Sequence, residues 1–106
     1  MKNLISIADM SRSEIISLFR LTEKLKKTPH QPLLKDKVLA MIFAKPSTRT
    51  RVSFTVAMNH LGGHVIFLNK NDIQLGRSET IADTGKVLSR YCDFIATIKS
   101  RLRNLF

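Results

Sequence analysis

The sequence lacks the features that mark several special classes of protein. No apolar run approaches the roughly 18–20 residues of a membrane-spanning helix, and the first residues contain no hydrophobic segment of a secretory signal. Tryptophan is absent and only one aromatic residue is not phenylalanine, so no motif for stacking RNA bases is visible. The single cysteine, Cys92, excludes an internal disulfide and is expected to be a buried small hydrophobic residue. We therefore expect a cytoplasmic protein with no membrane partner.

Acidic residues are also scarce: 8 Asp and Glu residues accompany 18 Lys and Arg residues, for a formal net charge of +10. A surplus of this size makes a small basic nucleic-acid-binding protein one alternative. The basic residues are, however, spread along the chain. Lys24, Lys26 and Lys27 close a predicted helix, where they complement its dipole, and a surplus of charge alone supports only non-specific binding. We expect no nucleic-acid partner.

The chain is expected to form one domain, since 106 residues with 43% hydrophobic side chains can bury a single modest core. Capping-box spacing, apolar periodicity and breaks at glycine or proline divide it into alternating helices and strands. The predicted helices run from Ser11 to about Lys27, from the 47–50 turn to Leu61 and from Thr80 to Tyr91, and the predicted strands cover 38–43, 64–68 and 94–98. This alternation predicts a three-layer α/β/α fold with an open parallel sheet.

Apolar positions within these elements predict the core. The continuous run Val38–Phe43 is typical of a strand covered on both faces, and Met41 and Met58 are expected to fill the core. Stripes of apolar residues indicate the helix faces that pack inward. They are Ile15, Leu18, Phe19, Thr22 and Leu25 in the first helix, Val52, Val56, Ala57, His60 and Leu61 in the second, and Ile81, Thr84, Leu88 and Tyr91 in the third.

The segment Ser47-Thr48-Arg49-Thr50-Arg51 is the densest group of hydrogen-bond donors in the chain. It follows a predicted strand and opens a predicted helix, whose unpaired N–H groups and positive dipole end point the same way. Such a turn can bind an anion, and phosphate suits it best. The alternative is an ordinary Ser or Thr N-cap followed by solvated arginines.

A polar segment follows the second predicted strand. It contains Asn71–Arg77, whereas Ser47–Thr50 follows the first strand. Since the carboxyl ends of parallel strands share one edge of the sheet, both segments are expected at a common ligand-binding edge. The histidines show no spacing typical of a metal site, and Asp72, Glu79 and Asp83 are interpreted as solvated or helix-terminal charges rather than an acid–base pair. We predict no metal and no cofactor.

The segment Phe43–Phe54 closely resembles the carbamoyl-phosphate motif of the aspartate/ornithine carbamoyltransferase family. The likeness continues through residues 57–58, 61–64, 71–77, 79–84 and 87–91, and it covers roughly residues 1–95. Lys45-Pro46 and Gln74–Arg77 resemble the ornithine branch of the family rather than the aspartate branch, which remains the rival enzyme hypothesis. Because a family enzyme has two domains, the resemblance implies that residues 1–106 form part of the N-terminal, carbamoyl-phosphate-binding domain.

The resemblance implies a role as the N-terminal part of an ornithine carbamoyltransferase. In that reaction the side-chain amine of ornithine attacks the carbonyl carbon of carbamoyl phosphate, phosphate leaves and citrulline forms, a step of arginine metabolism. The substrate-binding residues implied by matching positions are Ser47, Thr48, Arg49, Thr50 and Gln74. Arg49 is the implied catalytic residue, because its planar fork can pair with two phosphate oxygens and steady the departing charge. Gln74 matches a position that reaches the neighbouring subunit's site in family trimers, and Arg51 is expected to pair with a nearby carboxylate.

Other parts of the family's machinery have no counterpart in the sequence. The position of a further arginine after the third strand is Ile98, no His-Pro-x-Gln segment is present, and residues 96–106 depart from the family pattern. The second, ornithine-binding domain is also missing, so the chain by itself is expected to be inactive. The expected partners are carbamoyl phosphate, further subunits of a homotrimer or larger assembly, and ornithine only if another chain supplies the second domain. The alternative is a catalytically inactive anion-binding remnant or a subunit-association module.

Overall fold

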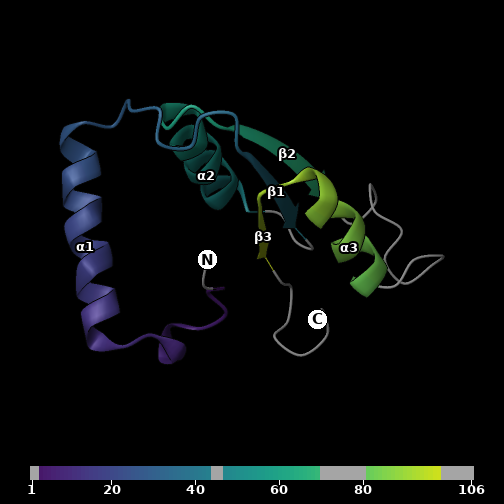
Figure 1. Cartoon of the computed structure of the whole chain (residues 1–106), viewed down its shortest axis with the longest axis horizontal. Helices are drawn as coiled ribbons and strands as arrows, with labels where there is room; N and C mark the ends of the chain where they lie inside the picture. Colours follow the sequence, from purple (N-terminus) through teal and green to yellow (C-terminus); the bar gives the residue numbers. More distant parts are fainter. Residues whose placement is uncertain (1–2, 44–46, 70–80, 99–106) are drawn as a thin grey trace.

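The computed structural model describes residues 3–43, 47–69 and 81–98 (Figure 1). The elements follow the predicted order and most boundaries agree within one residue. They are the short 3-10 helix η1 (Ile7–Asp9), α1 (Arg12–Lys27), β1 (Val38–Phe43), α2 (Thr48–His60), β2 (His64–Asn69), α3 (Ile81–Tyr91) and β3 (Phe94–Ile98). None of the helices in these ranges is long and apolar enough to cross a bilayer.

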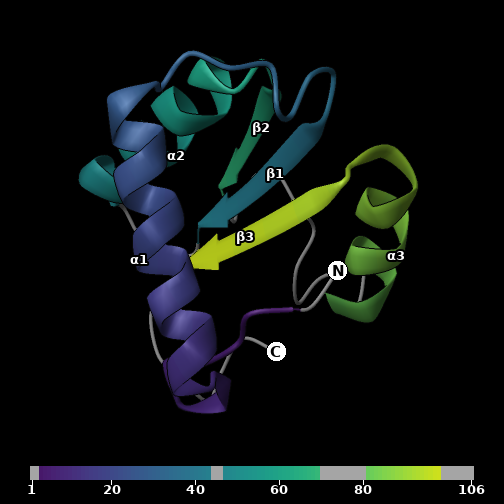
Figure 2. The same ribbon diagram turned by 60° about the vertical axis from the view of Figure 1, so that its left-hand side comes forward.

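The three strands form a parallel sheet in the order β2-β1-β3, with β1 in the centre. In the register, Phe43 at the end of β1 pairs with Asn69 of β2 and with Ile98 of β3. The chain steps outward from β1 to β2 and then back across to β3, so right-handed crossovers place α2 and α3 on opposite faces. Figure 2 shows these two helices on either side of the sheet. The predicted three-layer α/β/α architecture is confirmed.

The core is built on β1, whose residues from Leu39 to Phe43 are all buried. On one face Leu39, Met41 and Phe43 pack with Met58 of α2, and Met41 is fully buried. The expectation that Met41 and Met58 fill the core is confirmed. A central strand that is covered by a helix on each face has to be apolar along its whole length, which explains the uninterrupted hydrophobic run.

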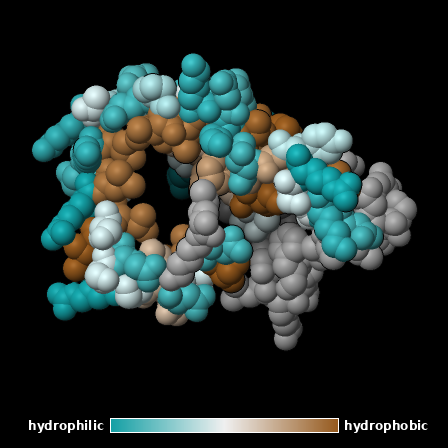
Figure 3. Space-filling model, viewed as in Figure 1, coloured by the Kyte–Doolittle hydropathy of each residue, from teal (hydrophilic) through white to brown (hydrophobic). Residues whose placement is uncertain are grey.

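Helix α1 begins where the sequence predicts, because Ser11 and Glu14 form a capping box. The Ser11 hydroxyl accepts the Glu14 N–H at 3.2 Å, and Glu14 Oε1 accepts the Ser11 N–H at 2.9 Å. The predicted apolar stripe, however, is not buried: no residue of α1 is, and Phe19 is 67% exposed. Figure 3 shows hydrophobic residues along α1 bordering an opening between this helix and the rest of the molecule.

Helix α2 packs on the sheet through a face that the apolar stripe does not predict. Val52 and Val56 are 54% and 43% exposed, whereas Met58 is the buried residue of this helix. Thr55 is half-buried and shares one side of the helix with the buried Met58 and with Arg51, which is exposed overall. The prediction was wrong for Val52, Val56 and Ala57, which are exposed, whereas His60 and Leu61 are half-buried. Because α2 carries apolar residues around much of its circumference, hydrophobicity alone does not select a face.

Two expectations near the C-terminal end of α3 also need correction. Tyr91, placed in the inward stripe, is 77% exposed, although Thr84 of the same stripe is buried. Cys92 is half-buried rather than buried. Both residues lie where α3 ends and the chain turns into β3, so the helical period no longer decides which side chains meet the sheet.

Candidate functional site

The residues Ser47–Thr50 lie at the carboxyl edge of the sheet. Strand β1 ends at Phe43 and α2 begins at Thr48, with Ser47 as the residue before its first turn. Since all three strands are parallel, this edge also receives the ends of β2 and β3 at Asn69 and Ile98. The predicted placement of the motif between a strand and a helix, at this edge, is therefore confirmed. Open α/β sheets bind their ligands beyond this edge.

Ser47 precedes α2 but does not cap it. Its side chain makes no capping hydrogen bond, and only its backbone carbonyl takes part, accepting the Arg51 N–H at 3.0 Å. This differs from Ser11, whose hydroxyl caps α1. The first N–H groups of any α-helix have no acceptor within the helix. At α2 the Ser47 side chain does not accept any of them, so the alternative of an ordinary Ser N-cap does not describe this residue.

The first turn of α2 is positively charged. It contains no acidic residue, while Arg49 is exposed and Thr50 is half-buried beside it. The amino end of the helix dipole adds partial positive charge at the same place. A guanidinium with rigid, fork-shaped donors pairs well with two oxygens of a phosphate. Together the Ser47 hydroxyl, the helix N–H groups and Arg49 can hold an anion with several oxygen atoms.

Arg51 has a partner that the sequence did not indicate. Its guanidinium carbon lies 3.7 Å from the centre of the Phe67 ring, in a cation–π contact. The Phe67 ring in turn meets Phe43 edge to face, with the ring centres 5.3 Å apart and an angle of 89° between planes. We expected a carboxylate beside Arg51; in the described part of the chain its partner is an aromatic ring. Phe67 lies on β2, and the packing of α2 against this strand brings the two residues together.

Several predicted site residues fall outside the described ranges. Gln74 is one of them, together with the rest of Asn71–Arg77 and with Lys45-Pro46, so their positions at the edge remain predictions. Ile98, which the resemblance aligns with an arginine of the family, is the last residue of β3, and its backbone pairs in register with Phe43. The position therefore lies at the carboxyl edge, where a cation would help to hold an anion.

The histidines pair locally. The His30 and His60 rings are tilted by 48° with their centres 4.2 Å apart, and His64 Nε2 lies 3.9 Å from Asp36 Oδ1. Within residues 3–43, 47–69 and 81–98, no three His, Cys, Asp or Glu side chains gather closely enough to hold a metal ion.

Comparison with known proteins gives consistent relatives. The family described as "Aspartate/ornithine carbamoyltransferase, carbamoyl-P binding domain" matches residues 2–103. The anabolic ornithine carbamoyltransferase of Pyrococcus furiosus is 54% identical over 100 residues, which are 89% of this chain and 31% of that protein. The chain therefore spans about a third of the length of the curated relatives it matches.

Solved structures agree in fold as well as in sequence. The anabolic ornithine carbamoyltransferase of Campylobacter jejuni superposes with a TM-score of 0.88 at 44% identity, covering 95% of this chain and 33% of that one. An N-acetyl-L-ornithine transcarbamylase superposes with a TM-score of 0.84 at 33% identity, covering 92% of this chain and 32% of that one. This chain therefore matches about a third of each of two solved proteins that are named for different amine substrates.

Proposed function

The chain belongs to the aspartate/ornithine carbamoyltransferase family as its N-terminal, carbamoyl-phosphate-binding domain, and we propose that it binds carbamoyl phosphate through Ser47, Thr48, Arg49 and Thr50. The observation that carries the proposal is that the Ser47 side chain makes no capping hydrogen bond at the start of α2. The Ser47 hydroxyl and the first helix N–H groups can therefore serve a bound anion, and Arg49 supplies a full positive charge. Gln74 is proposed to complete the site from a neighbouring subunit.

Within a complete enzyme, these donors would serve carbamoyl transfer. Negative charge on the phosphate oxygens increases as the bond between phosphate and the carbonyl carbon breaks. Donors that are already in place stabilise this charge without rearranging. We propose Arg49 as the catalytic residue, because its guanidinium can keep its hydrogen bonds to the phosphate oxygens while the substrate is converted to product. Ser47, Thr48 and Thr50 orient the substrate so that its carbonyl carbon faces the incoming amine.

The amine acceptor is proposed to be ornithine, in the service of arginine biosynthesis. The supporting relatives are the ornithine carbamoyltransferases, two of which are named anabolic. The acceptor site must come from the remaining two-thirds of the enzyme, since this chain spans about a third of its relatives. In this proposal the isolated chain binds carbamoyl phosphate but forms no citrulline, and an assay for citrulline with the pure chain tests that part.

A titration of the full chain tests the binding proposal. Carbamoyl phosphate, and inorganic phosphate as a stable probe, are added to labelled protein, and backbone amide shifts are followed. We expect the Ser47–Thr50 amides to move most. Arg49→Ala is expected to weaken binding by about tenfold or more, since a charge-assisted contact contributes about 1.5–3 kcal/mol.

Arg12 supplies the matched control. It is also an exposed arginine in the first turn of a helix, but α1 is already capped by Ser11. Arg12→Ala removes the same charge, so it is expected to change phosphate affinity less than twofold. Equal losses from the two variants would mean that only the net charge attracts the anion, and the assignment to α2 would be wrong.

A further inference from the structure

We propose that Arg51 is a positioning residue, which sets the orientation of the anion-binding turn by stacking on Phe67. This inference rests on the proposed function, because it concerns the same turn. Arg51 is assigned no contact with the anion. Its guanidinium is placed on an aromatic ring of β2, 3.7 Å from the ring centre.

The Phe67 ring contacts residues on both sides of the connection between β1 and α2. Phe43 is the last residue of β1, and its ring meets the Phe67 ring edge to face at 5.3 Å. On the other side of the connection, Arg51 lies over the same Phe67 ring, and its N–H donates to the carbonyl of Ser47. Phe67 therefore holds both Phe43, the last residue of β1, and the first turn of α2 in place.

The stack also fixes the rotation of α2 about its own axis. On the side of α2 toward the sheet, Met58 is buried and Thr55 is half-buried. Arg51 lies on the same side of the helix and is exposed overall, but its guanidinium rests over the Phe67 ring. Met58 lies near the C-terminal end of the helix, so Arg51 provides the attachment near the N-terminal end. Thr55 cannot replace it, since its hydroxyl donates back to the Arg51 carbonyl at 2.7 Å.

The orientation of Arg49 follows from this attachment. Residues two apart on a helix do not share a face, so holding Arg51 on the sheet directs Arg49 away from Phe67. A loosened first turn would let Arg49 and the helix N–H groups sample several orientations. Because a bound anion needs all of these donors at once, such freedom lowers affinity without removing any charge.

Two conservative substitutions separate positioning from simple charge. Arg51→Lys keeps the charge but loses the flat guanidinium face, and Phe67→Leu removes the ring, which carries no group that binds an anion. We expect each to weaken phosphate binding by the full chain roughly two- to fivefold, which corresponds to the loss of a cation–π contact at an exposed site. The double variant is expected to be no weaker than the worse single variant. Phe67→Tyr, which keeps the ring face, is expected to stay within twofold of wild type.

Ile66→Leu is the control for Phe67→Leu, since Ile66 precedes it in β2 and faces the other side of the sheet. It is expected to leave phosphate affinity unchanged. Urea unfolding of each variant is measured alongside binding. A purely structural role predicts that Arg51→Lys and Phe67→Leu lower the urea midpoint but leave the dissociation constant alone, and this result would overturn the inference. Additive losses in the double variant would overturn it too.

Failure of the proposed function has a different signature. If the wild-type chain binds no phosphate, or if Arg49→Ala binds as well as wild type, the anion site itself is wrong and the inference fails with it. If Arg49→Ala weakens binding but Arg51→Lys and Phe67→Leu do not, the site stands and only the positioning role is wrong.

Discussion

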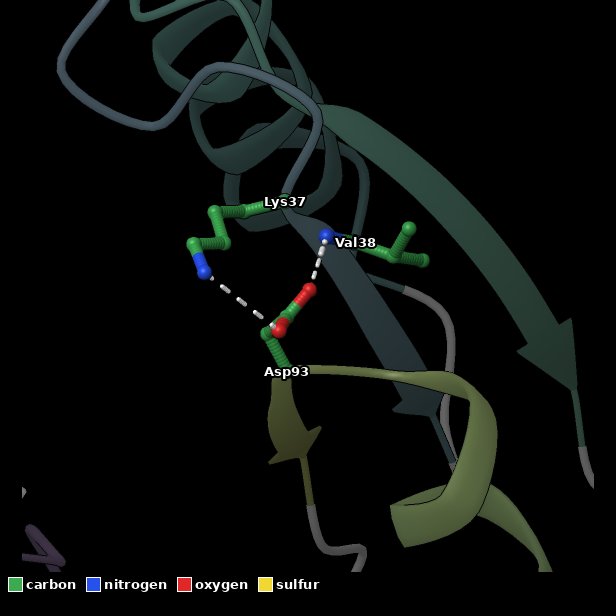
Figure 4. A network of polar contacts seen from close by, with 3 residues as sticks. All are labelled: Lys37, Val38 and Asp93. Atoms are coloured by element: carbon green, nitrogen blue, oxygen red, sulfur yellow. Dashed lines mark hydrogen bonds and ion pairs between the residues drawn. The ribbon is translucent and has the colours of Figure 1, made fainter.

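Asp93 and Val38 are joined by two hydrogen bonds that connect the start of β3 to the start of β1. The Asp93 N–H donates to the Val38 carbonyl at 2.9 Å. The Val38 N–H donates to Asp93 Oδ2 at 2.9 Å (Figure 4). Lys37 Nζ lies 3.9 Å from the other carboxylate oxygen. This pair closes the amino edge of the sheet, opposite the proposed anion site, and sets the register in which Leu39 meets Phe94.

Removal of the Asp93 carboxylate is expected to destabilise the fold. Asp93→Ala leaves the Val38 N–H without its acceptor, so the free energy of unfolding should fall by about 1 kcal/mol, the usual contribution of a partly exposed hydrogen bond. Asp93→Asn keeps an acceptor oxygen and should lose less. Lys37→Ala should change stability by less than about 0.5 kcal/mol, since an exposed ion pair contributes little. Urea unfolding measures all three, and an equal loss for Lys37→Ala would assign the effect to the ion pair instead.

Two glycines are expected to respond in opposite directions to alanine. At Gly63 an added Cβ would lie 2.5 Å from the Met58 Cε, 3.1 Å from the Lys37 carbonyl oxygen and 3.2 Å from that of Leu34. The methionine tip can move, but both carbonyl groups are backbone. We expect Gly63→Ala to destabilise the protein by about 1–3 kcal/mol, as overpacking does.

Gly85 is the matched case, because it lies within α3 and an added Cβ would meet nothing within 4 Å. Gly85→Ala is expected to stabilise the protein by about 0.5–1 kcal/mol through helix propensity alone. Thermal unfolding of the two variants decides the point. A destabilising Gly85→Ala would show that α3 packs more tightly at this position than the structure indicates.

Ser11 and Ser47 are expected to differ although each precedes a helix. Ser11→Ala removes the cap of α1 and should lower the free energy of unfolding by about 1 kcal/mol. Ser47→Ala removes no capping bond, so stability should stay nearly constant while phosphate affinity falls. Urea unfolding and phosphate titration of both variants measure the two quantities separately. A large loss of stability in Ser47→Ala would instead make this residue an ordinary cap.

The exposed apolar surface of α1 is expected to promote self-association. Phe19 is 67% exposed and Leu18 is 44% exposed on this helix, and hydrophobic residues that share a surface favour contact between molecules. We expect the wild-type chain to associate increasingly with concentration, and Phe19→Ser to reduce this. Glu23→Gln, an exposed polar change on the same helix, is the control. Sedimentation velocity over a range of concentrations measures the effect, and a strictly monomeric wild-type chain would contradict it.

Most of the fold was predictable because its signals are local. The capping box at Ser11 and Glu14, the breaks at Gly62-Gly63 and the apolar run Val38–Phe43 each depend on neighbours within a few residues. These determine where helices and strands begin and end. The position of the Ser47–Thr50 motif at the carboxyl edge also follows, since alternating helices and strands imply a parallel sheet.

The sequence by itself determined the elements, the parallel α/β order and the family, while the tertiary structure decided which surfaces meet. The partner of Arg51 is Phe67, Val52 and Val56 of α2 are exposed although they lie in its apolar stripe, and Phe19 of α1 is exposed as well. None of these follows from periodicity, because each depends on two segments that are far apart in the chain. Which face of α2 turns inward is set by the total packing with the sheet, and a stacked arginine can occupy a position where the pattern predicts a hydrophobic residue.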